Sequence, residues 1–99
     1  MAVYWLTFRF KEDAGRADRQ HRLLETVRLR SSRWWTESAS FLLFESAATI
    51  NHVAAAIRGA IDPRRDLALL GMPHVREARI IGSVRNDDLF ALMDFAKET

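Results

Sequence analysis

Apolar residues recur along the chain at two different spacings, and each spacing predicts a different kind of element. Spacings of three and four residues are typical of an amphipathic helix, whereas short apolar runs between turn residues indicate strands. The helix pattern is clearest at Ile50, Val53, Ala54, Ile57 and Ile61. In order, the sequence predicts a strand over 2–10, a helix over 16–30, strands over 32–37 and 40–45, a helix over 49–61, strands over 66–70 and 77–84, and a helix over 88–97.

This order, βαββαβ followed by an extra strand and helix, predicts an α+β fold of the split-βαβ, ferredoxin-like kind. Two helices cover only one face of such a sheet, and the other face is normally polar. The strand over 2–10 departs from this rule, because Val3, Trp5 and Thr7 place bulky, largely apolar groups on its second face. The strand over 40–45, SFLLFE, is also apolar on both sides.

A second apolar face of this size on a single chain usually marks an interface. We therefore expect a homodimer that packs sheet against sheet, as in a closed twofold contact. The candidate residues of this dimer face are Val3, Trp5, Thr7, Phe41 and Leu43. The alternative cover is the extra C-terminal strand and helix of the same chain.

Composition narrows the class of protein without naming a function. A chain of 99 residues is expected to form one domain over 1–99, and the absence of cysteine excludes disulfides and thiolate metal sites. No apolar run approaches the ~20 residues of a membrane span, and the first residues lack a signal-peptide pattern. The sequence therefore predicts a cytoplasmic protein without membrane association.

The positive charges are unusual in kind. Of the fifteen lysines and arginines, all but Lys11 and Lys97 are arginine, and six arginines fall within residues 16–33. Because the arginine fork matches phosphate oxygens, nucleic acid is a candidate partner. The candidate contacts are Arg9, Arg16, Arg19, Arg22 and Arg33. The alternative is that these side chains form an ordinary solvated helix face.

No catalytic, cofactor or metal motif is evident. His21, His52 and His74 lie in different elements without metal-ligand spacing. The acidic pairs at 12–13 and 87–88 precede helices, where carboxylates satisfy free amide groups, and divalent-metal binding is the alternative. Aromatic residues on the first and third strands also allow base stacking, although the glycine and basic residue of the RNA-recognition pattern are missing.

Four stretches, VYWLTFRF, LLETV, RWWTESASFLLFES and INHVAAAIRGAIDPRRDLALL, carry a resemblance over residues 2–70. They resemble the small CRISPR-associated ferredoxin-like nucleases of the integration-complex subunit family, and more closely their short SinR-like bacterial relatives. The resemblance implies a ferredoxin-like fold and a homodimer. In catalytic members, an aspartate at the end of the first strand, paired across the dimer, is proposed to bind a divalent metal for phosphodiester cleavage.

Arg9 stands at the position of that aspartate, and a guanidinium cannot coordinate magnesium. We therefore expect a non-catalytic relative with a structural or nucleic-acid-associated role, and no cofactor. Two alternatives remain open at this point. One is a metal-dependent ribonuclease that uses Glu12 or Asp13, and the other is a module whose sheet face binds a small ligand or a protein partner.

Overall fold

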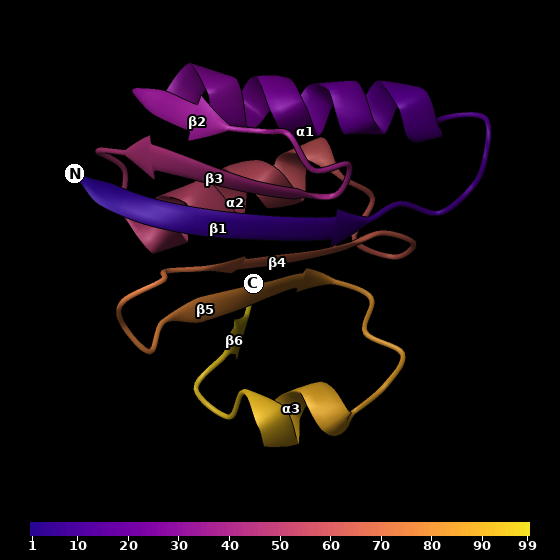
Figure 1. The fold of residues 1–99 in the computed structure, drawn as a ribbon. Helices are drawn as coiled ribbons and strands as arrows, with labels where there is room; N and C mark the ends of the chain where they lie inside the picture. The colour runs from indigo at the N-terminus through magenta and orange to yellow at the C-terminus, as the bar shows by residue number, and fades with distance from the viewer.

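The computed structural model describes residues 1–99 as one mixed sheet with three helices (Figure 1). The strands are β1 (Ala2–Arg9), β2 (Arg33–Trp35), β3 (Phe41–Ser46), β4 (Leu67–Gly71), β5 (Ala78–Gly82) and β6 (Lys97–Glu98). The helices are α1 (Arg16–Arg30), α2 (Ile50–Ala60) and α3 (Asp88–Leu92). The α+β fold expected from the sequence is confirmed.

The six strands lie in the order β2-β3-β1-β4-β5-β6. Neighbouring strands are antiparallel throughout, except that β6 pairs with β5 in parallel. The central strand β1 pairs with β3 on one side and with β4 on the other, so its backbone is hydrogen-bonded along both edges. β5 extends the sheet beyond β4, and the C-terminal segment lies at that end (Figure 1).

Both long helices pack on the same face of the sheet. The inward residues Tyr4, Leu6, Leu42 and Phe44 are buried and belong to one core cluster with residues of α1 and α2. The helical residues of this cluster include Leu23, Val27, Val53, Ala54 and Ile57. The Tyr4 side chain is buried, and its hydroxyl donates to the Ala48 carbonyl oxygen at 2.7 Å. The core is therefore one layer of side chains between sheet and helices.

The two long helices begin and end close to where the sequence predicts. α1 coincides with the predicted helix 16–30, and α2 lies within the predicted 49–61. Thr49 is the N-cap of α2, and its hydroxyl accepts from the His52 backbone N–H at 3.3 Å, which is the usual role of threonine at this position. No helix in the structure has the length and apolar composition needed to cross a membrane.

The predicted helix over 88–97 is wrong in its second half. α3 ends at Leu92, none of its residues is buried, and the chain then extends into β6. The Thr99 N–H donates to the Ile80 carbonyl oxygen at 2.9 Å. The edge of β5 supplies hydrogen bonds to the extended segment. The helix lacks comparable support, because α3 packs no residue into the core and its Leu92 is 85% exposed.

The expected capping by Asp87 or Asp88 is also not observed. Asp87 occupies the N-cap position of α3 without a side-chain hydrogen bond. The Asn86 side chain fills this role instead, because its oxygen accepts from the Asp88 backbone N–H at 2.9 Å.

Candidate functional site

The face of the sheet opposite α1 and α2, here called the open face, carries the predicted dimer residues side by side. In the β1–β3 register, Trp5 lies opposite Leu43 and Thr7 lies opposite Phe41. Val3 is on the same face, two residues before Trp5. All five side chains are partly exposed, in contrast to the buried residues that alternate with them. The structure thus brings the five residues together on one surface.

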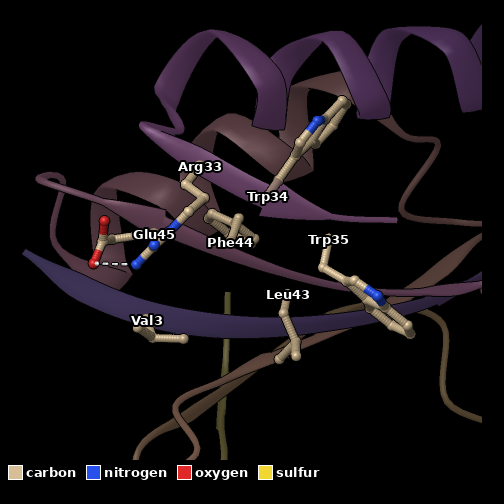
Figure 2. Close-up of a pocket in the computed structure, with 7 residues that line it drawn as sticks. All are labelled: Val3, Arg33, Trp34, Trp35, Leu43, Phe44 and Glu45. Carbon is tan, nitrogen blue, oxygen red and sulfur yellow. Dashed lines mark ion pairs between the residues drawn. The ribbon is translucent and has the colours of Figure 1, made fainter. Parts of the chain in front are cut away.

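Trp35 of β2 extends the open face beyond β3. It lies opposite Leu43, and its ring meets that of Phe41 edge-on, with centroids 6.5 Å apart and planes at 67°. Trp35 is 42% exposed. Its neighbour Trp34 has the opposite orientation: Figure 2 shows Trp34 directed toward α1, and Trp35 directed to the same side as Val3 and Leu43. Adjacent tryptophans therefore serve different faces of the sheet.

Trp5 lies against the backbone of the neighbouring strand. Gly71 of β4 is its cross-strand partner, and a Cβ atom added at Gly71 would overlap the indole ring. The absence of a side chain at Gly71 allows the ring to lie close to the sheet, which is a recognised use of glycine in strands. The large aromatic side chain in the middle of the open face therefore rests on a glycine.

A shallow pocket of about 260 Å³ opens at the β2 side of this face (Figure 2). Val3, Leu43 and Trp35 supply apolar walls, and Arg33 and Glu45 supply the charged groups. The Arg33 Nη2 and Glu45 Oε2 atoms are 3.8 Å apart, and Arg33 is largely exposed. A pair this long contributes little to stability, so the exposed Arg33 remains available to a partner. Glu45 also accepts a hydrogen bond from the Ser32 hydroxyl at 3.1 Å.

Toward β5 the residues of the open face are buried and no longer exposed. Ala78 and Ile80 lie on the same side as Trp5 and Leu69 by register, yet both are buried. The C-terminal segment lies at this end of the sheet, whereas β1 and β3 are farther away (Figure 1). The same-chain cover considered from the sequence therefore does not extend over Trp5, Phe41 and Leu43, which stay partly exposed.

The five candidate arginines do not form a single surface. Arg9 and Arg33 lie near opposite ends of the open face, and Arg9 Nη2 donates to the Ser83 carbonyl oxygen at 3.3 Å. Arg16 and Arg22 lie on α1, and Arg16 is paired with Glu12 at 2.7 Å.

Arg19, the fifth candidate, is buried among carboxylates. It donates to Asp66 through Nε at 2.8 Å and Nη2 at 3.1 Å, and to Asp13 through Nη1 at 2.9 Å. The hydrogen bonds to Asp66, and then those to Asp13, raise the pKa of its guanidinium. Arg19 therefore connects α1 to the rest of the fold and is not free to contact a nucleic acid.

The carboxylates offered for metal binding are also engaged. Asp13 is paired with Arg19 at 2.9 Å and with Arg65 at 3.3 Å, and the hydrogen bond from Arg19 is the main reason that its pKa lies below the ordinary value. Glu12 is paired with Arg16. His, Asp and Glu side chains nowhere gather in threes or more as a metal ion would require, and the three histidines stay apart.

Two important residues, Asp66 and Gly71, were not singled out from the sequence. Asp66, at the start of the run DLALL, is completely buried and accepts from Arg19. Gly71 supports Trp5. Trp35 differs from these two, because the alternation of Trp34 and Trp35 along the predicted strand already indicates that they lie on opposite faces. A charged residue next to an apolar strand was the available signal for Asp66, but nothing in the sequence identifies its partner.

Comparison of the chain with protein-family models, with curated proteins and with solved structures finds no match to any of them. The assignment of function therefore depends on the geometry of this chain.

Proposed function

We propose that the protein is a non-catalytic homodimer in which the open faces of two copies pack together, sheet against sheet. The observation that carries this proposal is the uninterrupted row of apolar and aromatic side chains across β2, β3 and β1, opposite the helix-covered face. Trp35, Phe41, Leu43 and Trp5 form its centre. Such a centre, rich in aromatic residues and free of charge, is typical of the buried part of a protein interface.

The charges of the open face support a second copy as the occupant. Arg9 lies near one end of the face, whereas Arg33 and Glu45 lie at the other. A twofold contact places a surface patch against itself. When the two copies of β1 run in opposite directions, each Arg9 comes to the end where the other copy has its Glu45. The uncharged centre is then buried, and Arg9 of each copy lies at the rim near Glu45 of the other, which its neighbour Arg33 partly balances.

We propose a ferredoxin-like topology for residues 2–71. The order βαββαβ, the sheet order β2-β3-β1-β4 and the location of both helices on one face support it. β5 and β6 are then additions to this unit. We also propose a relationship to the CRISPR-associated nucleases and their SinR-like relatives, and the same layout supports it.

A non-catalytic role within such a family is favoured over the ribonuclease alternative. Arg9 at the end of β1 brings a positive charge to the position that a metal-binding aspartate would occupy. Asp13 and Glu12, the acidic residues of the alternative, already neutralise arginines of the fold. Metal binding there would first have to break these ion pairs.

The experiment is sedimentation velocity of the purified chain and of two leucine variants. We expect the parent to sediment as a species of twice the 11.4 kDa chain mass. Leu43→Glu places a charge at the centre of the open face and should give a monomer, because an unpaired charge in an interface is costly to desolvate. Leu29→Glu introduces the same change on α1, where Leu29 is 70% exposed, and should remain dimeric.

A far-UV circular dichroism spectrum like that of the parent shows that the Leu43→Glu variant is folded. A parent that is monomeric at 100 μM, or a folded Leu43→Glu variant that remains dimeric, would contradict the proposal. A monomeric parent that binds an oligonucleotide through Trp5 would instead favour base stacking on the open face.

A further inference from the structure

A second hollow lies between the two long helices, away from the open face. It has a volume of about 440 Å³, and six residues of α1 line it: His21, Arg22, Glu25, Thr26, Leu29 and Arg30. From α2 it is lined only by the small residues Ala56, Gly59 and Ala60. We call it the interhelix groove. Because α2 contributes no long side chain, the α1 residues determine its chemistry.

The interhelix groove is positively charged. Seven arginines of the chain are in ion pairs with carboxylates, but Arg22 and Arg30 are not among them. The one carboxylate at the groove, Glu25, is held by Arg28 through two hydrogen bonds of 3.0 and 2.9 Å. The hydrogen bonds from Arg28 also lower the pKa of Glu25. Glu25 therefore balances Arg28 and leaves the charges of Arg22 and Arg30 uncompensated.

Arg30 has a donor without an acceptor. Its Nη1 donates to the Thr26 carbonyl oxygen at 3.0 Å, but its Nε–H is buried and has no hydrogen-bond partner. It is the only buried side-chain nitrogen or oxygen in the structure without one. A buried donor left unsatisfied is unfavourable. An anionic oxygen in the groove, reached by a small movement of the Arg30 side chain, would provide the missing acceptor.

We propose that the interhelix groove binds the phosphodiester backbone of a nucleic acid strand. Arg22 and Arg30 are eight residues apart on α1, which corresponds to about 12 Å along the helix axis. One strand of a duplex carries a charge about every 3.4 Å along its axis, so this span covers several phosphates and suits a chain better than one phosphate. The guanidinium groups bind phosphate oxygens, and the Thr26 hydroxyl and His21 lie between and beside them.

The test is fluorescence anisotropy of a labelled, mixed-sequence 20-mer single strand, titrated with the full chain between 50 and 200 mM salt. Arg22→Gln/Arg30→Gln is the groove variant. Arg64→Gln/Arg85→Gln is the matched control. Both arginines are exposed, lie outside the groove and form no ion pair, and the double substitution removes the same charge.

We expect the groove variant to bind about tenfold more weakly at 50 mM salt. The slope of log affinity against log salt should decrease in magnitude by about 1.4, because two contacts of about 0.7 each are lost for a single strand. The control should stay within about threefold of the parent. Absence of binding by the parent at 50 mM salt, or equal losses in both variants, would overturn the proposal.

Two further measurements complete the test. Adenosine monophosphate should not displace the strand at equal concentration, and displacement would overturn the strand proposal in favour of a site for one phosphate. The groove lies on the helix side, so this proposal does not rest on the proposed dimer. Sedimentation of the groove variant separates the dimer proposal from the groove proposal. We expect the groove variant to have the same oligomeric state as the parent, whatever the result with nucleic acid.

Discussion

Asp66 is a buried carboxylate that joins three segments of the fold. Its carboxylate is fully buried and accepts from the backbone N–H groups of Lys11 and Asp62, both at 2.9 Å, and from Arg19. Burial alone would raise its pKa, but the hydrogen bonds from Arg19, Asp62 and Lys11 outweigh burial, and the pKa lies below the ordinary value. Asp66 thus joins the end of β1, the first turns of α1 and the loop before β4.

Replacing this carboxylate should weaken the fold in a pH-dependent way. Asp66→Asn should lower the free energy of unfolding at pH 7 by about 3 kcal/mol, because it removes a buried charge that Arg19 and two backbone donors require. The folded-state pKa is depressed, so the contribution of Asp66 is present above the unfolded value of about 3.9 and is lost as pH falls through the folded value. Urea unfolding at pH 7 and at pH 3 should show the difference from the parent shrinking in acid.

The control is Asp94→Asn. Asp94 pairs with Arg76 at 2.9 Å, but both side chains are 75% exposed, so the midpoint should hardly change. If Asp66→Asn and Asp94→Asn unfold at the same urea concentration at pH 7, Asp66 does not have the role described.

At the scale of elements, prediction from sequence succeeds where one element alone carries the information. The 15-residue α1 and 11-residue α2 repeat their apolar positions over several turns, and breaks at both ends limit them. Local alternation along β1 and β3 also places Val3, Trp5, Thr7, Phe41 and Leu43 on one face of the sheet. Three contacts instead join residues far apart in the sequence. The Trp5 ring packs on Gly71, Arg19 donates to Asp66, and Arg79 donates to the Asn51 side-chain oxygen. No local pattern encodes such pairings.

The C-terminal segment shows most clearly that helical spacing alone does not predict a long, stable helix. Leu89 and Leu92 have helical spacing, but α3 has only five residues and buries none of them. Short helices gain most of their stability from packing. We therefore expect the amide hydrogens of α3 to exchange by local opening, orders of magnitude faster than those of β1.

Hydrogen exchange followed by mass spectrometry of the native chain tests this expectation. Peptides that cover 88–96 should be deuterated within seconds at neutral pH, and peptides that cover β1 should remain protected for much longer. Equal protection of the two segments would contradict the expectation, because α3 would then be as stable as β1 although none of its residues is buried.

At the scale of the whole molecule, the sheet separates two surfaces of different character. The proposed dimer would bury the open faces and leave one interhelix groove on each outer side. The apolar contact and the basic groove would therefore not compete, and a dimer would present two grooves to nucleic acid.

A dimer of this kind should also show its association in its thermal stability. Because dissociation accompanies unfolding, a hundredfold increase in protein concentration should stabilise the parent by about 2.7 kcal/mol of dimer, which raises Tm by several degrees. Scanning calorimetry at 2 and 200 μM measures this shift. The Leu43→Glu variant should show no dependence on concentration, and a constant Tm for the parent would count against the dimer.

The contact between Trp5 and Gly71 constrains how this surface can change. A methyl group at position 71 has no room while the indole is in place, and an indole at position 5 cannot lie flat once that methyl group is present. The two positions are therefore epistatic, and the order of mutations matters. A path that first shortens Trp5 leaves position 71 free to vary, whereas a path that begins at position 71 passes through a strained intermediate. Redesign of the open face has to start from the tryptophan.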